Sequence, residues 1–254
     1  MKVTFLGTGT SQGVPVIACG CGVCTSADEK DKRLRTSVLI EVDGKNFVID
    51  TGPDFRQQML NENVKHLDAV IFTHSHKDHV AGLDDIRAFN FKEDGTEMDV
   101  YATKEVQKAL MREFFYIFEA EKYPGVPQIS LHTIQNQPFV ANGVTFTPVE
   151  VEHFRMPVFG FRIKDFTYIT DANHIEPKEL EKIKGSKVLV LNALRKTPHV
   201  SHFSLSEAID LVKEVNPERA YFTHISHYMG AHQEVSKELP ENVFLAHDGL
   251  SIEI

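Results

Sequence analysis

Short apolar runs separated by turn residues dominate the hydrophobic pattern of the chain. Runs that are apolar throughout, or that alternate between apolar and polar residues, predict β-strands. In the first half these runs cover residues 3–6, 36–42, 45–50, 67–73 and 99–102. In the second half they cover residues 129–134, 144–151, 159–163, 167–170, 187–191 and 219–223. Asp43-Gly44 and Asp248-Gly249 predict hairpin turns, the second one between strands at 243–246 and 250–254.

Helices are predicted where apolar residues recur at helical spacing between these runs. They cover residues 54–62, 83–91, 104–118, 177–183 and 204–215. Pro177 suits a first helical turn, and Ser204 with Glu207 forms the sequence pattern of a capping box. The mixture of strands and helices predicts an α/β or α+β fold, and we treat residues 1–254 as one domain.

The charge balance narrows the class of partner. The 254 residues carry a net charge of −9, which argues against non-specific nucleic-acid binding because that needs a basic surface. An anionic substrate is still compatible, since bound metal ions reverse the sign of the local charge. The N-terminal apolar run is too short for a signal peptide, and no run approaches the roughly 18 apolar residues of a membrane span. We therefore expect a cytoplasmic protein without a membrane partner.

The clearest chemical signal is the segment 74–79, which reads His-Ser-His-Lys-Asp-His directly after an apolar strand. Imidazole and carboxylate groups suit Zn, Mn, Fe or Ni ions. His74 and His76 can reach one ion, while Asp78 and His79 face a second. A solvated polar loop is the alternative, but a chance run of this composition is rare.

Three further residues follow apolar strands directly, as His74 does: His153, Asp171 and His224. A lone His or Asp usually has a structural role. Placement at strand ends beside a metal-binding loop favours all three as ligands, and a carboxylate such as Asp171 can bridge two cations.

Cys19, Cys21 and Cys24 are the only cysteines of the chain. An odd number at this spacing is a poor disulfide framework and favours a metal site. Three thiolates on one loop need a fourth ligand from elsewhere to complete a tetrahedral zinc. The alternative is three reduced thiols.

The His-x-His-x-Asp-His segment, with the three later residues, resembles the metallo-β-lactamase superfamily. That resemblance implies a four-layer αββα sandwich with a dinuclear site at one edge of its sheets. It implies one cation held by His74, His76, His153 and Asp171, and a second held by Asp78, His79, Asp171 and His224. Asp50 in the Asp-Thr-Gly motif is expected to orient ligands through hydrogen bonds.

Further segments resemble the PhnP family of phosphodiesterases. They are residues 6–9, 13–15, the cysteine cluster, 82–87 and 202–204. The resemblance implies that the chain hydrolyses a small cyclic phosphate, either phosphoribosyl 1,2-cyclic phosphate or a 2′,3′-cyclic nucleotide. It implies two divalent ions, Zn or Mn, with a bridging hydroxide as nucleophile, and one structural Zn completed by His227.

The residues expected to act in catalysis are Asp78 and His202. His202 is the candidate proton donor to the leaving oxygen, with His199 as a weaker competitor. The loop 7–13 and Arg87 are candidates for contact with the phosphate or the sugar.

Three other functions share parts of this pattern. They are a tRNA 3′-end endonuclease, a PqqB-like protein of cofactor biosynthesis, and a non-catalytic zinc-binding scaffold. The endonuclease needs a basic RNA-gripping insertion, which the sequence lacks, and the complete ligand set argues against the other two. The expected partner is a small phosphodiester, and the aromatic end of helix 104–118 leaves a homodimer open.

Overall fold

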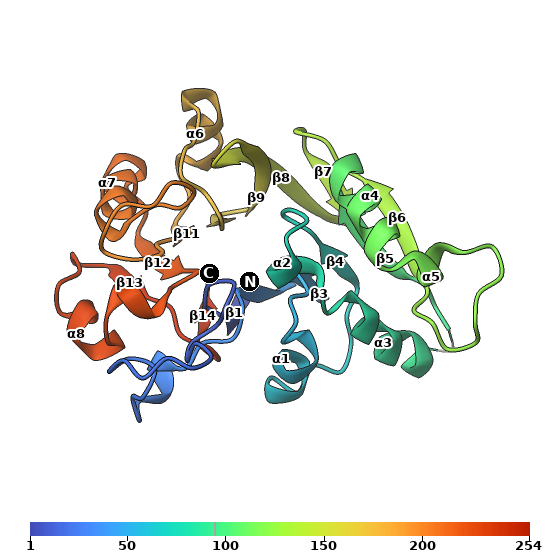
Figure 1. Ribbon diagram of the computed structural model, residues 1–254. Helices are drawn as coiled ribbons and strands as arrows, with labels where there is room; N and C mark the ends of the chain where they lie inside the picture. Colours follow the sequence, from blue (N-terminus) through green and yellow to red (C-terminus); the bar gives the residue numbers. More distant parts are fainter. Residues whose placement is uncertain (94) are drawn as a thin grey trace.

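Two mixed β-sheets of seven strands each form the framework of the protein (Figure 1). The computed structural model describes residues 1–93 and 95–254. The first sheet has the order β14 (Ser251–Glu253), β1 (Lys2–Gly7), β2 (Ser37–Val42), β3 (Lys45–Ile49), β4 (Ala69–Ile71), β5 (Met98–Ala102) and β6 (Ile129–Thr133). The second has the order β13 (Val243–Leu245), β12 (Arg219–Thr223), β11 (Val188–Asn192), β10 (Phe166–Tyr168), β9 (Met156–Ile163), β8 (Val144–His153) and β7 (Phe139–Ala141).

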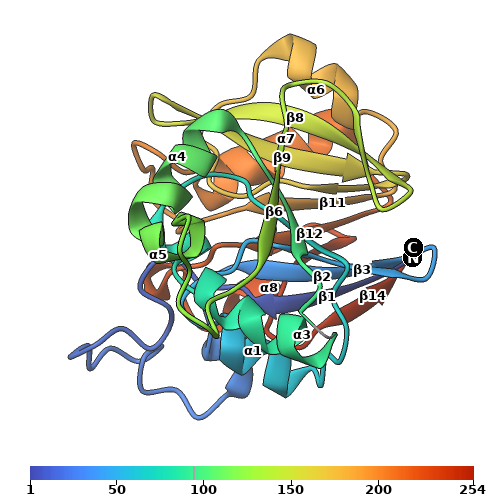
Figure 2. The ribbon, with the colours of Figure 1, turned by 90° about the vertical axis from the view of Figure 1, so that its right-hand side faces the viewer.

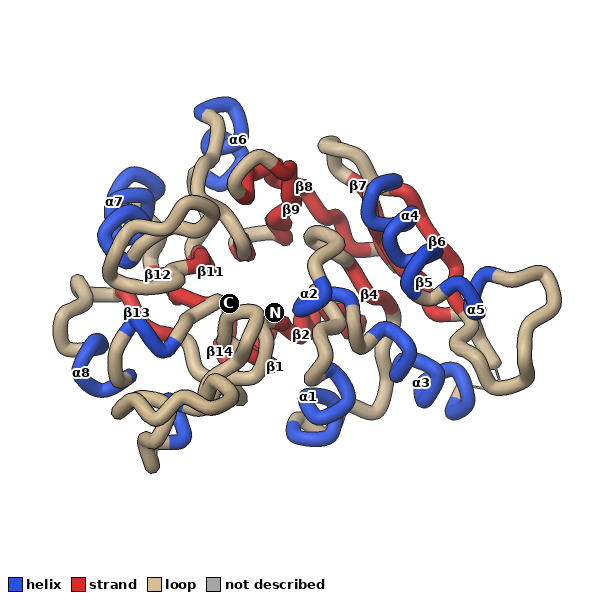
Figure 3. Tube along the Cα trace, viewed as in Figure 1, coloured by secondary structure: helices blue, strands red, loops and turns tan. Residues whose placement is uncertain are grey.

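Helices cover the outer face of each sheet, which gives the four layers of an αββα sandwich (Figures 1 and 3). The first sheet carries α1 (Phe55–Asn61), α2 (Lys77–Val80), α3 (Arg87–Lys92), α4 (Lys104–Glu113), α5 (Phe115–Phe118) and the 3₁₀ helix η2 (Leu83–Ile86). The second carries α6 (Pro177–Ile183), α7 (Leu205–Val215) and α8 (His232–Ser236). Two more 3₁₀ helices are η1 (Glu29–Asp31) and η3 (His227–Met229). No described helix is long and apolar enough to cross a membrane.

The alternating pattern of the strands explains why three apolar cores form. Side chains that alternate along a strand point to opposite faces, so each sheet buries one face against the other sheet and one against its helices. In β2, Val38 and Ile40 belong to the core between the sheets, whereas Leu39 packs toward the helices. The four-layer sandwich expected from the family resemblance is confirmed.

The predicted turn at Asp43-Gly44 joins β2 to β3 as an antiparallel hairpin. Both residues have left-handed backbone angles, with φ of 53° and 76°, as a two-residue hairpin turn requires. The capping box of Ser204 and Glu207 also forms at the start of α7.

The second predicted hairpin, around Asp248-Gly249, does not form. β13 pairs in parallel with β12 in the second sheet, whereas β14 pairs with β1 in the first. The Asp248 carboxylate accepts hydrogen bonds from Thr8 Oγ1 and from the backbone N–H of Leu34, both at 2.7 Å. These contacts lead the chain away from β13 and across to the first sheet.

The helix predicted at 104–118 is divided at Phe114. This residue leaves the helical conformation with φ −121° and ψ 42°, so α4 ends before it and α5 begins after it. The Tyr116 hydroxyl donates a hydrogen bond of 2.6 Å to Asp84, which draws α5 toward η2. The helix predicted at 83–91 is similarly divided into η2 and α3. The sequence pattern did not predict the strand β7.

β1 and β3 both pair antiparallel with β2, and β4 pairs parallel with β3. The strands β1, β3 and β4 therefore run in the same direction, and the end of β1 at Gly7 lies at the same edge as the ends of β3 and β4. Bridges between Gly9 and Ile225 bring the segment after β12 to the same edge. The two chain termini lie together at the other end, where Met1 and Ile254 exchange backbone hydrogen bonds (Figure 2). The loops that follow the ends of these strands therefore meet at one edge.

Candidate metal centre and active site

The loop 72–76 after β4 delivers the first imidazoles to this edge. β4 ends at Ile71 and α2 begins at Lys77, so the loop between them carries His74 and His76, while α2 carries Asp78 and His79. His74 and His79 are buried, whereas His76 is exposed. The short helix turns Asp78 and His79 away from His76, which separates the segment into two pairs of donors.

Residues of the second sheet and of the loops after its strands complete two sets of donors, and Asp171 belongs to both sets. We name the sets the first group, which contains His74, His76, His153 and Asp171, and the second group, which contains Asp78, His79, Asp171 and His224. Within each group the candidate ligand atoms lie within 4.8 Å of one another. The structure thus brings together the residues that the sequence suggested, in the same two sets.

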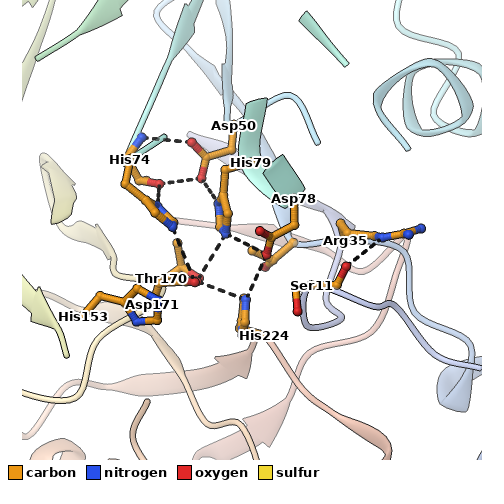
Figure 4. A network of polar contacts seen from close by, with 12 residues as sticks. Ser11, Arg35, Asp50, His74, Asp78, His79, His153, Thr170, Asp171 and His224 are labelled. Carbon is orange, nitrogen blue, oxygen red and sulfur yellow. Dashed lines mark hydrogen bonds and ion pairs between the residues drawn. The ribbon is translucent and has the colours of Figure 1, made fainter. Parts of the chain in front are cut away.

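Distances within the second group are those of donors around a shared centre (Figure 4). The Nε2 atoms of His79 and His224 lie 3.4 and 3.2 Å from Asp171 Oδ1. They lie 3.3 and 3.6 Å from Asp78 Oδ2. In the first group, His74 Nε2 lies 3.7 Å from Asp171 Oδ2. The two oxygens of Asp171 therefore face different groups, as a bridging carboxylate requires.

Four buried ring nitrogens in these groups have no hydrogen-bond partner: the Nε2 atoms of His74 and His79, and both ring nitrogens of His224. A buried polar atom without a partner is costly and calls for an explanation such as an ion. Imidazole nitrogens and carboxylate oxygens are the donors that zinc and manganese accept. The donor set therefore fits two divalent cations.

Asp50 fixes the orientation of His79. Its Oδ2 accepts a hydrogen bond of 2.7 Å from His79 Nδ1, so the Nε2 atom of His79 is left to face the second group. The same carboxylate accepts bonds from Thr73 N and Thr73 Oγ1 at 2.9 and 2.7 Å. This is the orienting contact that the Asp-Thr-Gly motif suggested.

His74 and His153 are oriented in the same way. The Thr73 hydroxyl donates its proton to Asp50, so it accepts from His74 Nδ1 at 3.0 Å. His153 Nδ1 donates to the backbone carbonyl of Ser201 at 2.7 Å. In both rings the Nε2 atom is left for the first group.

His153 lies within β8 rather than after it, which differs from the prediction. β8 continues to pair with β9 until His153 faces Met156. The polar residues Glu152 and His153 hide this extension in the sequence, because the apolar run stops at Val151.

The backbone is left-handed at Asp50, Asp171 and His224, with φ of 65°, 55° and 55°. Residues other than Gly rarely adopt this conformation, and when they do they often belong to functional sites. β3 and β12 end directly before Asp50 and His224, and β10 ends three residues before Asp171. The left-handed turn at each position therefore helps to direct the side chain into the site.

Opposed charges dominate the electrostatics of the second group. Burial disfavours a charged His79 ring, yet Asp171, Asp50 and Asp78 raise its pKa well above the usual value. Burial likewise opposes ionisation of Asp171, but His224, His79 and His74 hold its pKa well below the usual range. The site therefore stabilises concentrated positive charge beside ionised carboxylates.

His202, the candidate proton donor, lies between the two groups. Its ring centroid is 4.6 Å from that of His153 and 4.7 Å from that of His224. Burial, with the neighbouring His224, lowers the pKa of His202 to about 2, so the free ring is neutral. His199 lies further out, with its ring centroid 5.3 Å from that of His202.

The cysteines form a separate cluster, which we name the cysteine group. The sulfur atoms of Cys19, Cys21 and Cys24 lie 3.3, 3.4 and 3.3 Å from His227 Nδ1. A backbone hydrogen bond and His227 lower the pKa of Cys21 to about 6, whereas burial raises that of Cys24 to about 11. Three sulfurs around one imidazole nitrogen give the donor set of a closed structural zinc site.

The two candidates for phosphate contact have different positions. The Gly-rich loop runs beside the second group, since Thr8 and Thr10 exchange backbone hydrogen bonds with Ile225, next to His224. Arg87 forms an ion pair with Asp84 at 3.3 Å and belongs to neither group.

Sequence reasoning missed several residues that shape the site: Thr73, Ser201 and Phe154. Thr73 and Ser201 act through a hydroxyl and a carbonyl, which no ligand pattern reveals. Phe154 stands between two strand patterns, and its exposure is visible only in the structure.

Comparison with known proteins agrees with this geometry. A protein-family model described as the β-lactamase superfamily domain matches residues 45–225 of the sequence. The crystal structure titled as a new diphosphatase from the PhnP family has a TM-score of 0.93 and 39% identity, and the match covers 100% of this chain and 97% of that one. The chain therefore belongs to the metallo-β-lactamase superfamily. Within it, the similarity to that diphosphatase over both whole chains makes this a PhnP-family protein.

Other relatives carry different names. A protein of Porphyromonas gingivalis named octanoyltransferase is 39% identical over 98% of this chain, but the match covers only 51% of that protein. Zn(2+)-bound PqqB from Methylobacterium extorquens has a TM-score of 0.81 over the full length of both chains at 20% identity, which shows the fold alone. This chain spans about half the length, or less, of the curated relatives it matches.

Proposed function

We propose that the chain is a metal-dependent hydrolase that cleaves a phosphorus–oxygen bond of a small phosphodiester, with a cyclic phosphate as the preferred substrate. The observation that carries this proposal is the shared carboxylate of Asp171, which joins two groups that contain buried imidazole nitrogens without a hydrogen-bond partner. Sites that hold two divalent cations are typical of phosphoester hydrolases.

The first and second groups would each hold one divalent cation. When bound, the cations would supply Lewis acidity that activates water and neutralises the phosphoryl oxygens. The chain itself contributes orientation: Asp50, Thr73 and the Ser201 carbonyl hold the imidazoles of His79, His74 and His153 in fixed positions. Because these contacts exist before substrate binds, little reorganisation is needed during the reaction.

His202 is the proposed proton donor to the leaving oxygen. The His202 ring is neutral in the free protein and must take up a proton before it can donate one. An anionic phosphoryl group beside the ring favours this protonated form, because a nearby negative charge raises the pKa of an imidazole. Asp78 is the second residue that we propose to take part in catalysis. It belongs to the second group, where its carboxylate faces both His79 and His224.

A diphosphate is the second candidate substrate, because the similar PhnP-family structure is titled a diphosphatase. Attack at phosphorus is common to both substrates, and they differ in whether the leaving group is a sugar oxygen or a second phosphate. Octanoyl transfer and PQQ synthesis are not proposed for this chain, since the matches cover only 51% and 38% of the proteins that carry those names.

The test is hydrolysis by purified protein supplied with Zn or Mn. We expect turnover of the general substrate bis(p-nitrophenyl) phosphate. We also expect turnover of 2′,3′-cyclic nucleotides if the substrate is a cyclic phosphate, or of ADP-ribose if it is a diphosphate. His74→Ala should lose both turnover and bound metal, while His66→Ala, at an exposed histidine paired with Glu93, should keep both. His202→Ala should keep the metal and lose rate.

The proposal is wrong if metal-loaded protein hydrolyses none of these substrates. Full turnover by His202→Ala would remove only the proton-donor assignment. Cleavage restricted to tRNA precursors would favour the endonuclease instead.

A further inference from the structure

A pocket of about 470 Å³ opens beside the first group, and we name it the rim pocket. Its wall includes two members of that group, His76 and His153. It also includes Val200 and Ser201, which directly precede the candidate proton donor. A substrate whose phosphorus lies at the metal groups would therefore place its leaving or ester group in this pocket.

Phe154 gives the rim pocket an unusual surface. It is the first residue of the two-residue turn between β8 and β9, and its side chain is 55% exposed. Its φ is 61°, in the left-handed region where turns normally place Gly or Asn. A large aromatic ring in this position is unfavourable for the turn and unfavourable in water, so folding alone does not account for it.

The turn is held firmly relative to the site. The backbone N–H of Phe154 donates to Asn173 Oδ1 at 2.6 Å. Asn173 N in turn donates to the Glu152 carbonyl at 2.8 Å. Asn173 lies two residues after Asp171, so the same segment that supplies the shared carboxylate also positions the ring.

Arg155 adds positive charge to this surface. Its guanidinium carbon lies 5.2 Å from the centroid of the Phe154 ring. An arginine against an aromatic ring forms a planar cationic surface that suits stacking on a base and attraction of a phosphate. Exposed Val200 supplies a further apolar contact in the same wall.

Resting on the proposed function, we infer that the rim pocket binds the nucleobase of a nucleotide substrate, stacked on Phe154 and Arg155. The substrate class is then a nucleoside phosphate rather than a base-free sugar phosphate. A ribosyl group alone has no planar face for the ring to contact, whereas every base has one. The pocket volume lies within the usual range for small-ligand sites.

The test compares two ligands that share a phosphorylated ribose and differ in the base. Calorimetric titration of metal-loaded protein with adenosine 5′-monophosphate and ribose 5-phosphate should show about tenfold tighter binding of the nucleotide. Phe154→Asn should abolish this difference, because it removes the ring but suits the left-handed turn. Phe154→Tyr keeps the ring and should retain the difference.

Two measurements separate this role from a structural one. The melting temperature of Phe154→Asn should equal or exceed that of the wild type, since Asn tolerates the backbone conformation. Phe91→Asn, at a ring of similar exposure in α3, should leave the nucleotide preference unchanged.

The inference is overturned if the wild-type protein binds both ligands equally, or if Phe154→Asn weakens both to the same extent. Hydrolysis of bis(p-nitrophenyl) phosphate in that case would leave the proposed function standing. Conversely, a base preference that depends on Phe154, in protein without any hydrolytic activity, would support the pocket and refute the proposed function.

Discussion

Single polar contacts behind the metal-facing atoms determine how the candidate site is arranged. The carboxylate of Asp50 is fully buried and accepts hydrogen bonds from Thr73 and His79. It does not belong to either group, yet it decides which nitrogen of His79 faces the second group. Such supporting contacts commonly contribute as much to a metal site as a ligand does.

Asp50→Asn should therefore weaken cation binding at the second group by about 10- to 100-fold. The amide presents a donor to His79 Nδ1 or to Thr73 Oγ1, and either arrangement disturbs the ring. Competition with a chromophoric chelator would measure the affinity. Asp43→Asn, at an exposed carboxylate that pairs with Lys164, is the control and should bind cations like the wild type. Unchanged affinity in Asp50→Asn would refute the orienting role.

A buried histidine outside both groups makes the stability of the fold depend on pH. His232 is buried, and its Nδ1 accepts a hydrogen bond of 3.2 Å from the Arg33 guanidinium. Burial, with the nearby Arg33 charge, lowers the pKa of His232 to about 4. Its neutral form therefore stabilises the fold above about pH 6.5, and this contribution is lost as the pH falls toward 4.

His232→Asn keeps an acceptor for Arg33 and removes the titrating ring. Over this window the unfolding free energy of the wild type should fall more steeply than that of the variant, by up to about 1.4 kcal/mol per pH unit. Urea unfolding between pH 7 and 5 would measure both slopes. Equal slopes would show that His232 takes up no extra proton on unfolding.

At the scale of elements, close backbone approach fixes the loop that carries the site. A Cβ on Gly52 would lie 2.2 Å from the backbone carbonyl oxygen of Asp78, and a Cβ on Gly82 would lie 2.2 Å from that of Gly52. The Asp-Thr-Gly motif after β3 therefore packs directly against α2. Gly52 is needed for close contact rather than for turn geometry.

Gly52→Ala should displace α2, lower the unfolding free energy by about 1–3 kcal/mol and weaken cation binding at the second group. Gly22→Ala, where an added Cβ meets nothing within 4 Å, should have little effect on stability. Thermal unfolding and metal content of the two variants give the comparison. A Gly52→Ala protein with wild-type values would mean that the two backbones separate without cost.

Elements were predictable from the sequence where local patterns agree with the fold. The Asp43-Gly44 hairpin, the helix opened by Pro177 and the strand before His224 all formed as expected. The division of 104–118 was not predictable, because Tyr116 bonds to a residue 32 positions away. The same applies to β14, whose partner is the strand at the other end of the chain.

The site residues were suggested by a short motif and by strand ends, and the structure brings them together. Their orienting partners were less accessible to prediction. The Ser201 carbonyl that holds His153 lies 48 positions away and has no side-chain signature. Long-range backbone contacts of this kind appear only once the sheets are assembled.

At the scale of the whole molecule, the cysteine group joins distant parts of the chain. It connects the loop around residues 16–24 with η3, more than 200 positions later. A structural ion in this group would hold the N-terminal loop against the segment that follows His224. The group contains a full set of four donors, so it needs no ligand from substrate.

Cys24→Ser should reduce the metal content by one equivalent and make residues 16–24 more susceptible to limited proteolysis. The cations of the first and second groups should remain. Elemental analysis and mass spectrometry of the cleavage products would measure both effects, with Ile17→Ala, at a 93% exposed residue of the same loop, as the control. Unchanged metal content in Cys24→Ser would remove the zinc assignment.

The pairing of β1 with β14 has a consequence for synthesis of the protein. The strand β1 has no partner on one side until residues 251–253 have been made, so one border of the first sheet stays open until then. His224 also emerges late, and the second group lacks a donor until then. A nascent chain stalled before this point would expose an unpaired strand edge, which is a known starting point for aggregation.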